Sequence, residues 1–503
     1  MALAALTSLS LAGLTASAAQ AGAPVASRTA AATVQVQVVG IDTNGKQTSV
    51  LASIYSVSAG TVVITDGQAV HVATGKYWVG ASVPTQVNGI VISQTLVMRL
   101  VSISSSETIA LRARGRTLVG LHLTVPATQN PEYVEACIGG TFVSGAAAPA
   151  GALYAVPVQA KDFRFSYATT WQGTTASYEL AGVSEGGIPD TVNHQADPAT
   201  MARVRFQLRA SEVPGGFGDL TMTPASNCII PPLSAADSLP APGTLTEYVS
   251  PGRWTPEMVT TRAAFWRSTL DFAAGRSYTD TFGGAVWGPG NEFPYVNGHD
   301  IYYSPISAFV DPAQASGGEC CDTSDITLSL GGRVIKHVVM TSQGFGQFSA
   351  RMPSAGWYTL AIRARRTAPG LTIPASMLSR SEAVRWHFHA APDAAGATPP
   401  VTITRYVARG LNADNQAPAA GTTKLALRVV AAPNSGFRLK TLTVQASSDG
   451  GKTWHAVTVV RQGGHWLATV HDPSAGYVAL RSTVTDTAGN STVQTIYQAY
   501  AIG

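Results

Sequence analysis

Residues 34–38 read Val-Gln-Val-Gln-Val, and residues 425–429, near the other end of the chain, read Leu-Ala-Leu-Arg-Val. Apolar side chains at every second position are typical of a strand with one face on a core and one in water. Residues 121–125 and 442–446 repeat the pattern. Turn dipeptides follow or separate such runs: Asn44-Gly45, Asp66-Gly67, Asn88-Gly89 and Asp449-Gly450. Short strands joined by such turns predict an all-β chain of tandem β-sandwiches.

Helical periodicity is scarce in this sequence. The one stretch in which we expect a helix is Pro256–Ala273.

The length of 503 residues is too great for one compact core and suits several domains. Pro, Ala, Gly and Ser cluster at residues 126–131, 231–242 and 390–400, where we expect joints. The predicted units are a leader at 1–28, a prealbumin-like sandwich at 30–126, sandwiches at 127–240 and 245–392, and an immunoglobulin-like sandwich at 400–503.

The N-terminus has the features of a secretory signal. Residues 2–19 are small or apolar and uncharged, and Ala16-Ser17-Ala18 and Ala19-Gln20-Ala21 both fit a signal-peptidase site. No Lys or Arg precedes the apolar run, since the first charged residue is Arg28, so a disordered Ala-rich leader is the alternative. We expect a secreted, extracellular protein.

Charged residues make up only 12% of the chain, against about 25% in typical soluble proteins. A net charge of +4 spread over 503 residues argues against a nucleic-acid partner. A hydrophobic content of 45% excludes general disorder, and no apolar run after the leader is long enough for a membrane span.

Residues 401–503 carry nine Lys and Arg against four Asp and Glu. That excess fits an anionic surface such as a cell wall, or simply a solvated face.

Four cysteines are compatible with export: Cys137, Cys228, Cys320 and Cys321. They allow three pairings, of which the simplest joins Cys137 to Cys228 and Cys320 to Cys321. Reduced cysteines are the alternative. Zinc is disfavoured because no C-x-x-C is present and no His flanks a cysteine. We expect no metal and no cofactor.

Residues 182–186, Gly-Val-Ser-Glu-Gly, match the spacing of a nucleophile elbow around Ser184. The elbow needs a helix after the serine, whereas Gly187-Ile188-Pro189-Asp190 indicates a turn. We therefore interpret the segment as a loop between strands, and no catalytic residue is assigned.

Residues 447–454, Ser-Ser-Asp-Gly-Gly-Lys-Thr-Trp, match the Asp-box pattern S-x-D-x-G-x-T-W. We expect a hairpin in which Asp449 accepts backbone hydrogen bonds, Gly450 and Gly451 adopt positive φ, and Trp454 is buried. Sialidases carry several such boxes, but this chain has one, so a structural turn is the preferred interpretation.

Residues 386–389, Trp-His-Phe-His, place two histidines on one face of a predicted strand. That spacing can bind a metal, but no third ligand is evident nearby. We expect an exposed face carrying His387 and His389, with Trp386 and Phe388 in the core.

Two groups of stretches carry a resemblance to known proteins. The later group comprises Tyr178–Pro189, Met201–Val204, Glu247–Gly252, Arg276–Pro289, Val384–Phe388, Asn415–Pro418 and the Asp box, and the earlier group comprises Lys76–Val79 and Leu111–Arg114. On the later group, the chain from about residue 160 onward resembles the non-catalytic region of secreted actinobacterial subtilisin-like serine peptidases. On the earlier group, residues 33–125 more loosely resemble the prealbumin-like sandwich of the same proteins.

The family's catalytic motifs are absent from this sequence. It has no Asp in a D-T/S-G context, no His in H-G-T and no Ser in G-T-S-M-A, and there is no room for the family's α/β catalytic domain. The resemblance thus implies accessory architecture without catalysis. We expect a secreted, non-enzymatic protein whose partner is a cell-wall polymer, a glycan or a protein. The alternatives are a hydrolase with an unrecognised site and an accessory chain of a separate peptidase.

Overall fold

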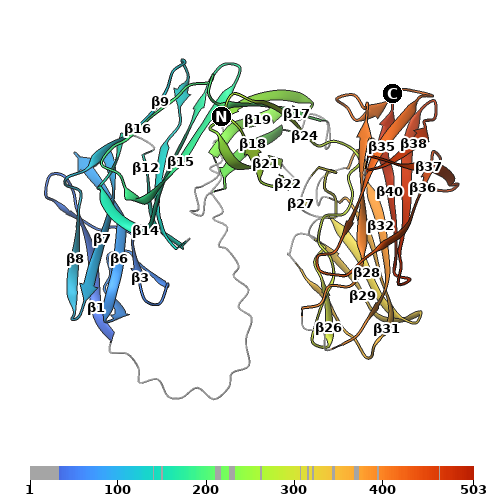
Figure 1. Cartoon of the computed structure of the whole chain (residues 1–503), viewed down its shortest axis with the longest axis horizontal. Coiled ribbons are helices and arrows are strands. Elements are labelled where there is room, and N and C mark those ends of the chain that lie inside the picture. The colour runs from blue at the N-terminus through green and yellow to red at the C-terminus, as the bar shows by residue number, and fades with distance from the viewer. Residues whose placement is uncertain are drawn as a thin grey trace.

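The computed structural model describes residues 33–139, 141–148, 151–209, 217–225, 233–260, 263–305, 308–313, 316–319, 322–341, 346–367, 373–392, 396–463 and 465–503. Within these ranges the chain forms strands and turns and no helix, so the predicted all-β class is confirmed. Figure 1 shows an arch in which β1 to β16 form one limb, β25, β26 and β28 to β40 form the other, and β17 to β24 with β27 bridge them. The leader at 1–28 lies outside the described residues.

The first limb and the bridge contain four sheets. The outer sheet comprises β1 (Thr33–Ile41), β2 (Gln47–Thr48), β5 (Val70–Ala73) and β8 (Glu107–Arg112). The middle sheet comprises β3 (Ala52–Ser56), β4 (Val62–Thr65), β6 (Gly75–Val87), β7 (Ile90–Ile103), β9 (Thr117–Leu123), β13 (Ala152–Ala155) and β16 (Val192–Ala196). The shared sheet comprises β10 (Thr128–Gln129), β11 (Glu132–Ile138), β12 (Thr141–Ala148), β14 (Val158–Gln172), β15 (Ser177–Ile188), β17 (Ala202–Leu208), β20 (Gly243–Val249) and β24 (Ser277–Phe282). The bridge sheet comprises β18 (Phe217–Pro224), β19 (Leu233–Pro240), β21 (Gly252–Thr260), β22 (Ala263–Trp266), β23 (Leu270–Phe272) and β27 (Ser316–Glu319).

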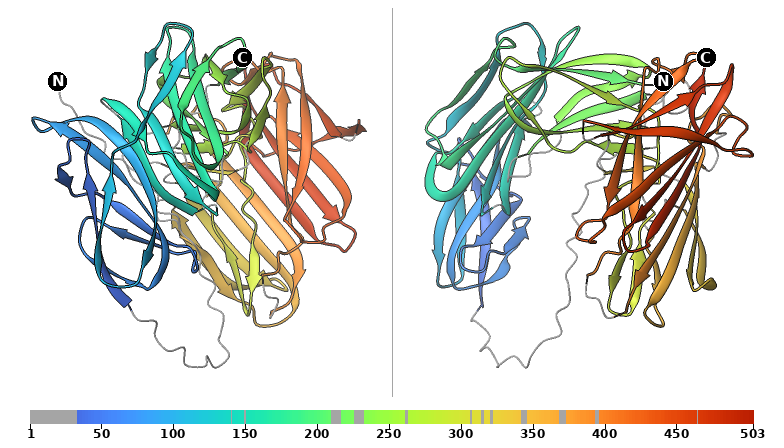
Figure 2. Two further views of the ribbon diagram at one scale, coloured as in Figure 1. Left: turned by 60° about the vertical axis from the view of Figure 1, so that its left-hand side comes forward. Right: turned by 45° about the vertical axis from the view of Figure 1, so that its right-hand side comes forward.

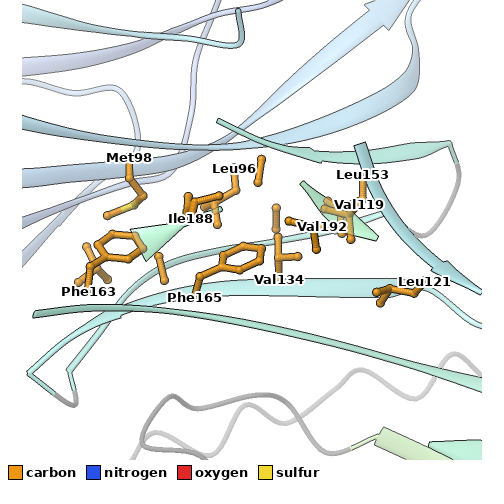
Figure 3. Close-up of a cluster of buried hydrophobic side chains, with 14 of the residues drawn as sticks. Leu96, Met98, Val119, Leu121, Val134, Leu153, Phe163, Phe165, Ile188 and Val192 are labelled. Carbon is orange, nitrogen blue, oxygen red and sulfur yellow. The ribbon is translucent and has the colours of Figure 1, made fainter. Parts of the chain in front are cut away.

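Each pair of neighbouring sheets encloses a core. Val36 and Val79 pack between the outer and middle sheets, and Leu96 and Phe165 pack between the middle and shared sheets (Figure 3). Phe206 and Met258 pack between the shared and bridge sheets. Because both faces of the middle sheet are covered, residues 77–81 of β6 are buried without a break rather than at alternate positions.

The second limb contains a small sheet and a long sheet. The small sheet comprises β25 (Tyr295–Asn297), β26 (Asp300–Tyr303) and β30 (Phe348–Arg351). The long sheet comprises β28 (Thr323–Leu330), β29 (Arg333–Thr341), β31 (Gly356–Arg365), β32 (Ser381–Ala390), β33 (Thr402–Arg409), β34 (Gln416–Ala417), β35 (Thr422–Ala431), β36 (Leu439–Ser447), β37 (His455–Gln462), β38 (His465–His471), β39 (Gly476–Asp486) and β40 (Ser491–Ile502). Figure 2 shows it passing through the whole limb.

The last part of the long sheet has an immunoglobulin-like arrangement, as expected for residues 400–503. One face of its sandwich has the order β37-β38-β35-β33, and the other has β40-β39-β36. These orders correspond to the D-E-B-A and G-F-C sheets of an immunoglobulin fold. Leu427, Val470 and Tyr500 pack between the two faces.

The expected joints are crossed by strand pairing, so the predicted boundaries need correction. At the first joint, β13 pairs with β7 and β9, which lie on the other side of residues 126–131. At the second, β20 pairs with β15 and β17, so the shared sheet runs continuously past residues 231–242. At the third, β32 pairs with β40. The free edge of each sandwich is thus filled by a strand from its neighbour, which local composition does not reveal.

Two local predictions also need correction. The proline-rich segment around residues 231–242 was expected to be a linker but contains β19, an edge strand of the bridge sheet, where proline is tolerated. The helix expected at Pro256–Ala273 is wrong, because that segment contributes β21, β22 and β23. Pro256, which an α-helix would tolerate only in its first turn, lies inside β21 opposite Met222 of β18.

Candidate functional site

Ser184 lies in the middle of β15, opposite Phe165 of β14. The expected loop is therefore wrong, and so is the elbow, because the serine sits in a continuous ladder and not at a strand-to-helix turn. Close packing explains why glycine stands at two positions near Ser184. A side chain at Gly182 would collide with the ring of Tyr167, and Gly187, at a φ of 125°, lies against the carbonyl of Val158 beside an irregularity in the pairing.

In the Asp-box segment, several hydrogen-bond donors surround Asp449. Carboxylate oxygens of Asp449 accept hydrogen bonds from the backbone N–H of Lys452 (2.9 Å) and from the N–H (2.9 and 3.0 Å) and hydroxyl (2.6 Å) of Thr453. The hydroxyl of Ser447 donates to Asp449 at 2.7 Å. These hydrogen bonds, chiefly those from Thr453, hold the pKa of Asp449 well below its usual range. Asp449 therefore organises a turn.

Trp454 closes the same hairpin. It is half-buried, and its Nε1 donates to the carbonyl of Gly451 at 2.9 Å. The guanidinium of Arg481 lies 4.0 Å from the centre of its ring, in a cation–π contact. The expected burial of Trp454 is thus partial, because the indole covers the hairpin rather than the core.

Cys137 is disulfide-bonded and fully buried in β11. Cys228, Cys320 and Cys321 lie outside the described residues, so the pairing of Cys137 with Cys228 stays a prediction.

Trp386 and Phe388 of β32 are 1% and 0% exposed and pack in the core between the long and small sheets, as expected. His387 and His389 therefore lie on the outer face of the long sheet. Among the described residues, no group of three or more His, Cys, Asp or Glu side chains is arranged to hold a metal.

The two histidines flank Trp357 of β31, which is 38% exposed. Its indole stacks on the His387 ring, with centroids 5.0 Å apart and planes 13° apart, and meets the His389 ring edge-on at 5.6 Å. Trp357 lies opposite His389 across the β31–β32 ladder. We call Trp357, His387 and His389 the aromatic platform. His387 covers part of the indole, and the exposed part of Trp357 presents an apolar surface on a rigid sheet.

The turn between β39 and β40 holds this platform in place. The Asn490 side-chain oxygen accepts a hydrogen bond from the N–H of His389 at 2.9 Å, and Asp486 accepts from Asn490 at 2.7 Å. Gly489 of the same turn lies against the edge of Trp357. The platform on β31 and β32 is therefore supported by a turn from the next sandwich.

Three arginines continue along the same face. The outward positions of the β31–β32 ladder pair Trp357 with His389, Thr359 with His387, Ala361 with Arg385, Arg363 with Ala383 and Arg365 with Ser381. Arg363, Arg365 and Arg385 are exposed. Asp325 of β28 lies opposite Arg363, and it bonds His337 Nε2 at 2.8 Å. We call the row from Trp357 to Arg365 on β31, together with its partners on β32, the binding stripe.

Sequence reasoning found only part of this surface. The alternation in β32 correctly placed both histidines outward, but Trp357 escaped notice because it is remote in sequence and joins them only through the pairing of β31 with β32. A single outward tryptophan within the alternating run Trp357–Arg365 was the available signal.

Buried carboxyl groups form a second unusual feature, on the side of the shared sheet that faces the bridge sheet. Burial raises the pKa of Glu135 to about 8. Burial likewise raises the pKa of Glu179 and Glu247 well above the ordinary range, and the charge of Glu179 raises that of Glu247 further. Neither carboxyl oxygen of Glu179 has a hydrogen-bond partner within the described residues. Because these carboxyl groups are buried and hold their protons, they bear on stability.

A pocket of about 230 Å³ lies in the last sandwich, lined by Ser448, His455, His471 and neighbours on β36 to β39. This volume is below the roughly 300–1,000 Å³ usual for small-molecule sites. The binding stripe is the stronger candidate.

Comparisons with known proteins identify no family, since no family model and no curated protein matches the chain. One similar solved structure is a tetra-tandem repeat from the extending region of a large adhesion protein, with 13% identity and a TM-score of 0.15, covering 93% of this chain and all of that one. Another is BcpA, the major pilin subunit of Bacillus cereus, with 10% identity and a TM-score of 0.12, covering 50% of this chain and 99% of that one. A third is Sidekick-1 immunoglobulin domains 1–4, with 11% identity and a TM-score of 0.13, covering 76% and 95%. At these TM-scores the likenesses carry no argument about function.

Among the described residues, no helix has the length and apolar character needed to cross a bilayer.

Proposed function

We propose that the chain is a non-catalytic binding module that works outside the cell and holds a glycan polymer against the aromatic platform. The observation that carries the proposal is the stacking of Trp357 on His387, with 38% of the tryptophan exposed on a sheet face. An indole that stays out of the core and keeps more than a third of its surface exposed is a feature of binding surfaces.

The chemistry of the platform suits a sugar. One face of a pyranose ring is lined by C–H groups and packs on an indole, while its hydroxyls exchange hydrogen bonds with imidazole nitrogens and with hydroxyls such as that of Thr359, which bonds His387 Nδ1 at 3.0 Å. An open sheet face, unlike a closed pocket, can bind a long chain at any point along it.

Work outside the cell is supported by the disulfide at Cys137, because disulfides persist in oxidising compartments. The leader-like residues 2–19 support it independently. Because the sequence resembles the non-catalytic region of subtilisin-like peptidases, we extend the proposal to an accessory role beside such a peptidase. Recovery of such a peptidase when the secreted protein is captured from its native culture would support that extension, and repeated capture without one would count against it.

The binding proposal is tested by co-sedimentation with insoluble chitin, cellulose and isolated bacterial cell walls. We expect the wild-type protein to sediment with at least one of them, and Trp357→Ala to lose at least tenfold in apparent affinity. The matched control is Tyr295→Ala, because Tyr295 is also 38% exposed and stacks on Tyr302 at 5.1 Å, but lies on the small sheet. Both variants should retain the wild-type melting temperature.

Absence of sedimentation with all three materials would contradict the proposal. Equal binding by wild type and Trp357→Ala would contradict the assignment of the platform.

A further inference from the structure

We propose that the ligand of the binding stripe is an acidic polysaccharide that carries carboxylates on its sugars and lies along β31 and β32 from Trp357 to Arg365. This inference rests on the proposed function, because the same platform anchors the chain, and it adds the ligand's charge and direction. Its evidence is the placement of Arg363, Arg365 and Arg385 on the face that presents Trp357.

The three arginines carry positive charge that the protein does not neutralise. Within the described residues none of them forms an ion pair, and all three are exposed. Asp325 is the one acidic side chain at an outward position of β28, β29, β31 and β32, which are described in full, and His337 occupies one of its oxygens. An unneutralised row of guanidinium groups fits an anionic ligand.

The stripe has a low floor between its large side chains. Across the ladder, Thr359, Ala361, Ala383 and Ser381 each lie opposite a larger side chain, namely His387, Arg385, Arg363 and Arg365 in that order. On the neighbouring strands, Thr327 and Ser329 of β28 and Ser491 of β40 continue the small residues. A polymer chain can therefore approach the sheet closely while the arginines reach it from either side.

The spacing of charges suits a carboxylated sugar chain. Arg363 and Arg365 are two residues apart on one strand, and Arg385 is the diagonal neighbour of Arg363, so the backbone positions of successive arginines lie about 7 Å apart. The row from Trp357 to Arg365 contains nine residues, and its eight intervals span roughly 26 Å. A polyuronate has one carboxylate per sugar, and each guanidinium can hold a carboxylate through two parallel hydrogen bonds.

Nucleic acid is a poorer match for this surface. Duplex DNA carries one charge per roughly 1.7 Å of axis, and its binders neutralise several phosphates at once. Three arginines on a chain of net charge +4 are too few for such a partner. The stacking indole beside spaced arginines favours a polymer that alternates apolar sugar faces with single charges.

The inference is tested with soluble polygalacturonate as the probe, in affinity electrophoresis and titration calorimetry at two salt concentrations. The same polymer with its carboxylates fully methyl-esterified is the neutral counterpart, and polyphosphate is the phosphate counterpart. The test variant is R363Q/R385Q. The matched control is R203Q/R205Q, because Arg203 and Arg205 are also exposed, alternate on β17 and lie in the shared sheet.

We expect polygalacturonate to bind, and its affinity to fall at least tenfold on esterification, at least tenfold in R363Q/R385Q and less than twofold in R203Q/R205Q. Higher salt should weaken the wild type more than R363Q/R385Q. Trp357→Ala should weaken both the acidic and the esterified polymer.

Three results would overturn the inference. Equal binding of the acidic and esterified polymers, dependent on Trp357, would leave the proposed glycan function standing and remove the charge preference. Tighter binding of polyphosphate than of polygalacturonate would replace the carboxylate with phosphate. Failure to bind any of these polymers, together with failure to sediment with chitin, cellulose or cell walls, would remove both proposals.

Discussion

Glu179 of β15 and Glu247 of β20 are both fully buried on adjacent parallel strands, and the charge of Glu179 raises the pKa of Glu247. Burial is the larger cause for both groups, because a carboxylate loses its hydration there. β15 precedes and β20 follows the expected joint at residues 231–242, so the two acids lie as diagonal neighbours on one buried face of a continuous sheet.

The raised pKa values of Glu179 and Glu247 predict that the free energy of unfolding falls as pH rises. In the unfolded chain these glutamates titrate near 4.5, whereas in the folded chain Glu179 and Glu247 keep their protons to well above that value and Glu135 to about 8. Their contribution to stability is therefore fully present below about pH 4.5 and is lost as pH rises through the folded pKa values.

We expect Glu179→Gln/Glu247→Gln to raise the melting temperature at pH 8 by several degrees and to flatten its decline between pH 5 and pH 8, as measured by scanning calorimetry. Glu185→Gln is the control, since Glu185 is exposed and pairs with Arg164 at 2.9 Å. A double variant whose melting temperature declines as steeply as that of the wild type would show that the pair is not responsible.

Asp449→Ala should lower the melting temperature of the last sandwich by a few degrees, because the backbone N–H groups of Lys452 and Thr453 lose their acceptor. Glycan binding should be unchanged. Asp414→Ala is a suitable control, as Asp414 is an exposed acid of the same sandwich. Thermal unfolding followed by circular dichroism, with the co-sedimentation assay, checks both points. An equally stable variant that lost binding would make Asp449 a ligand residue.

The disulfide of Cys137 should join it to Cys228. Closing a loop of about ninety residues would stabilise the fold by roughly 4–5 kcal/mol in the chain-entropy model. Peptide mapping of an unreduced digest by mass spectrometry should recover that pair and a separate Cys320–Cys321 peptide. A Cys137 peptide linked to Cys320 or Cys321 would contradict the assignment.

Ser184 should not react with a serine-directed fluorophosphonate probe, because it lies within a paired strand and lacks the geometry of an elbow. A known serine hydrolase labelled in parallel confirms that the probe is active. Stoichiometric labelling that disappears in Ser184→Ala would instead establish a nucleophile and revive the hydrolase alternative.

The sequence predicted local structure better than it predicted the joints. Alternation placed Trp386 and Phe388 inward and both histidines outward, because a strand's two faces follow directly from its period of two. The predictions of the three joints were wrong for a physical reason. Trp386 Nε1 donates a hydrogen bond to the Thr402 carbonyl at 2.7 Å, across the segment at residues 390–400 that was expected to be a linker. Contacts of this kind depend on which strand pairs with the free edge of a neighbouring sheet, and that pairing is not visible in local composition.

The candidate surface was predictable only in part for the same reason. His387 and His389 are near neighbours in sequence, whereas Trp357 and Arg363 come to the same sheet face only through the register of β31 with β32. The raised pKa values of the buried glutamates were equally hidden, because Glu179 and Glu247 are far apart in sequence and become buried only when the shared sheet packs on the bridge sheet.

The most direct test of the central claim is hydroxyl-radical footprinting of the whole protein with and without saturating polygalacturonate, read residue by residue by mass spectrometry. The account predicts that oxidation of Trp357, His387 and His389 falls severalfold when the polymer is bound, while oxidation of Tyr295 on the small sheet does not change. Unchanged oxidation of Trp357 at a polymer concentration that demonstrably binds the protein would contradict it.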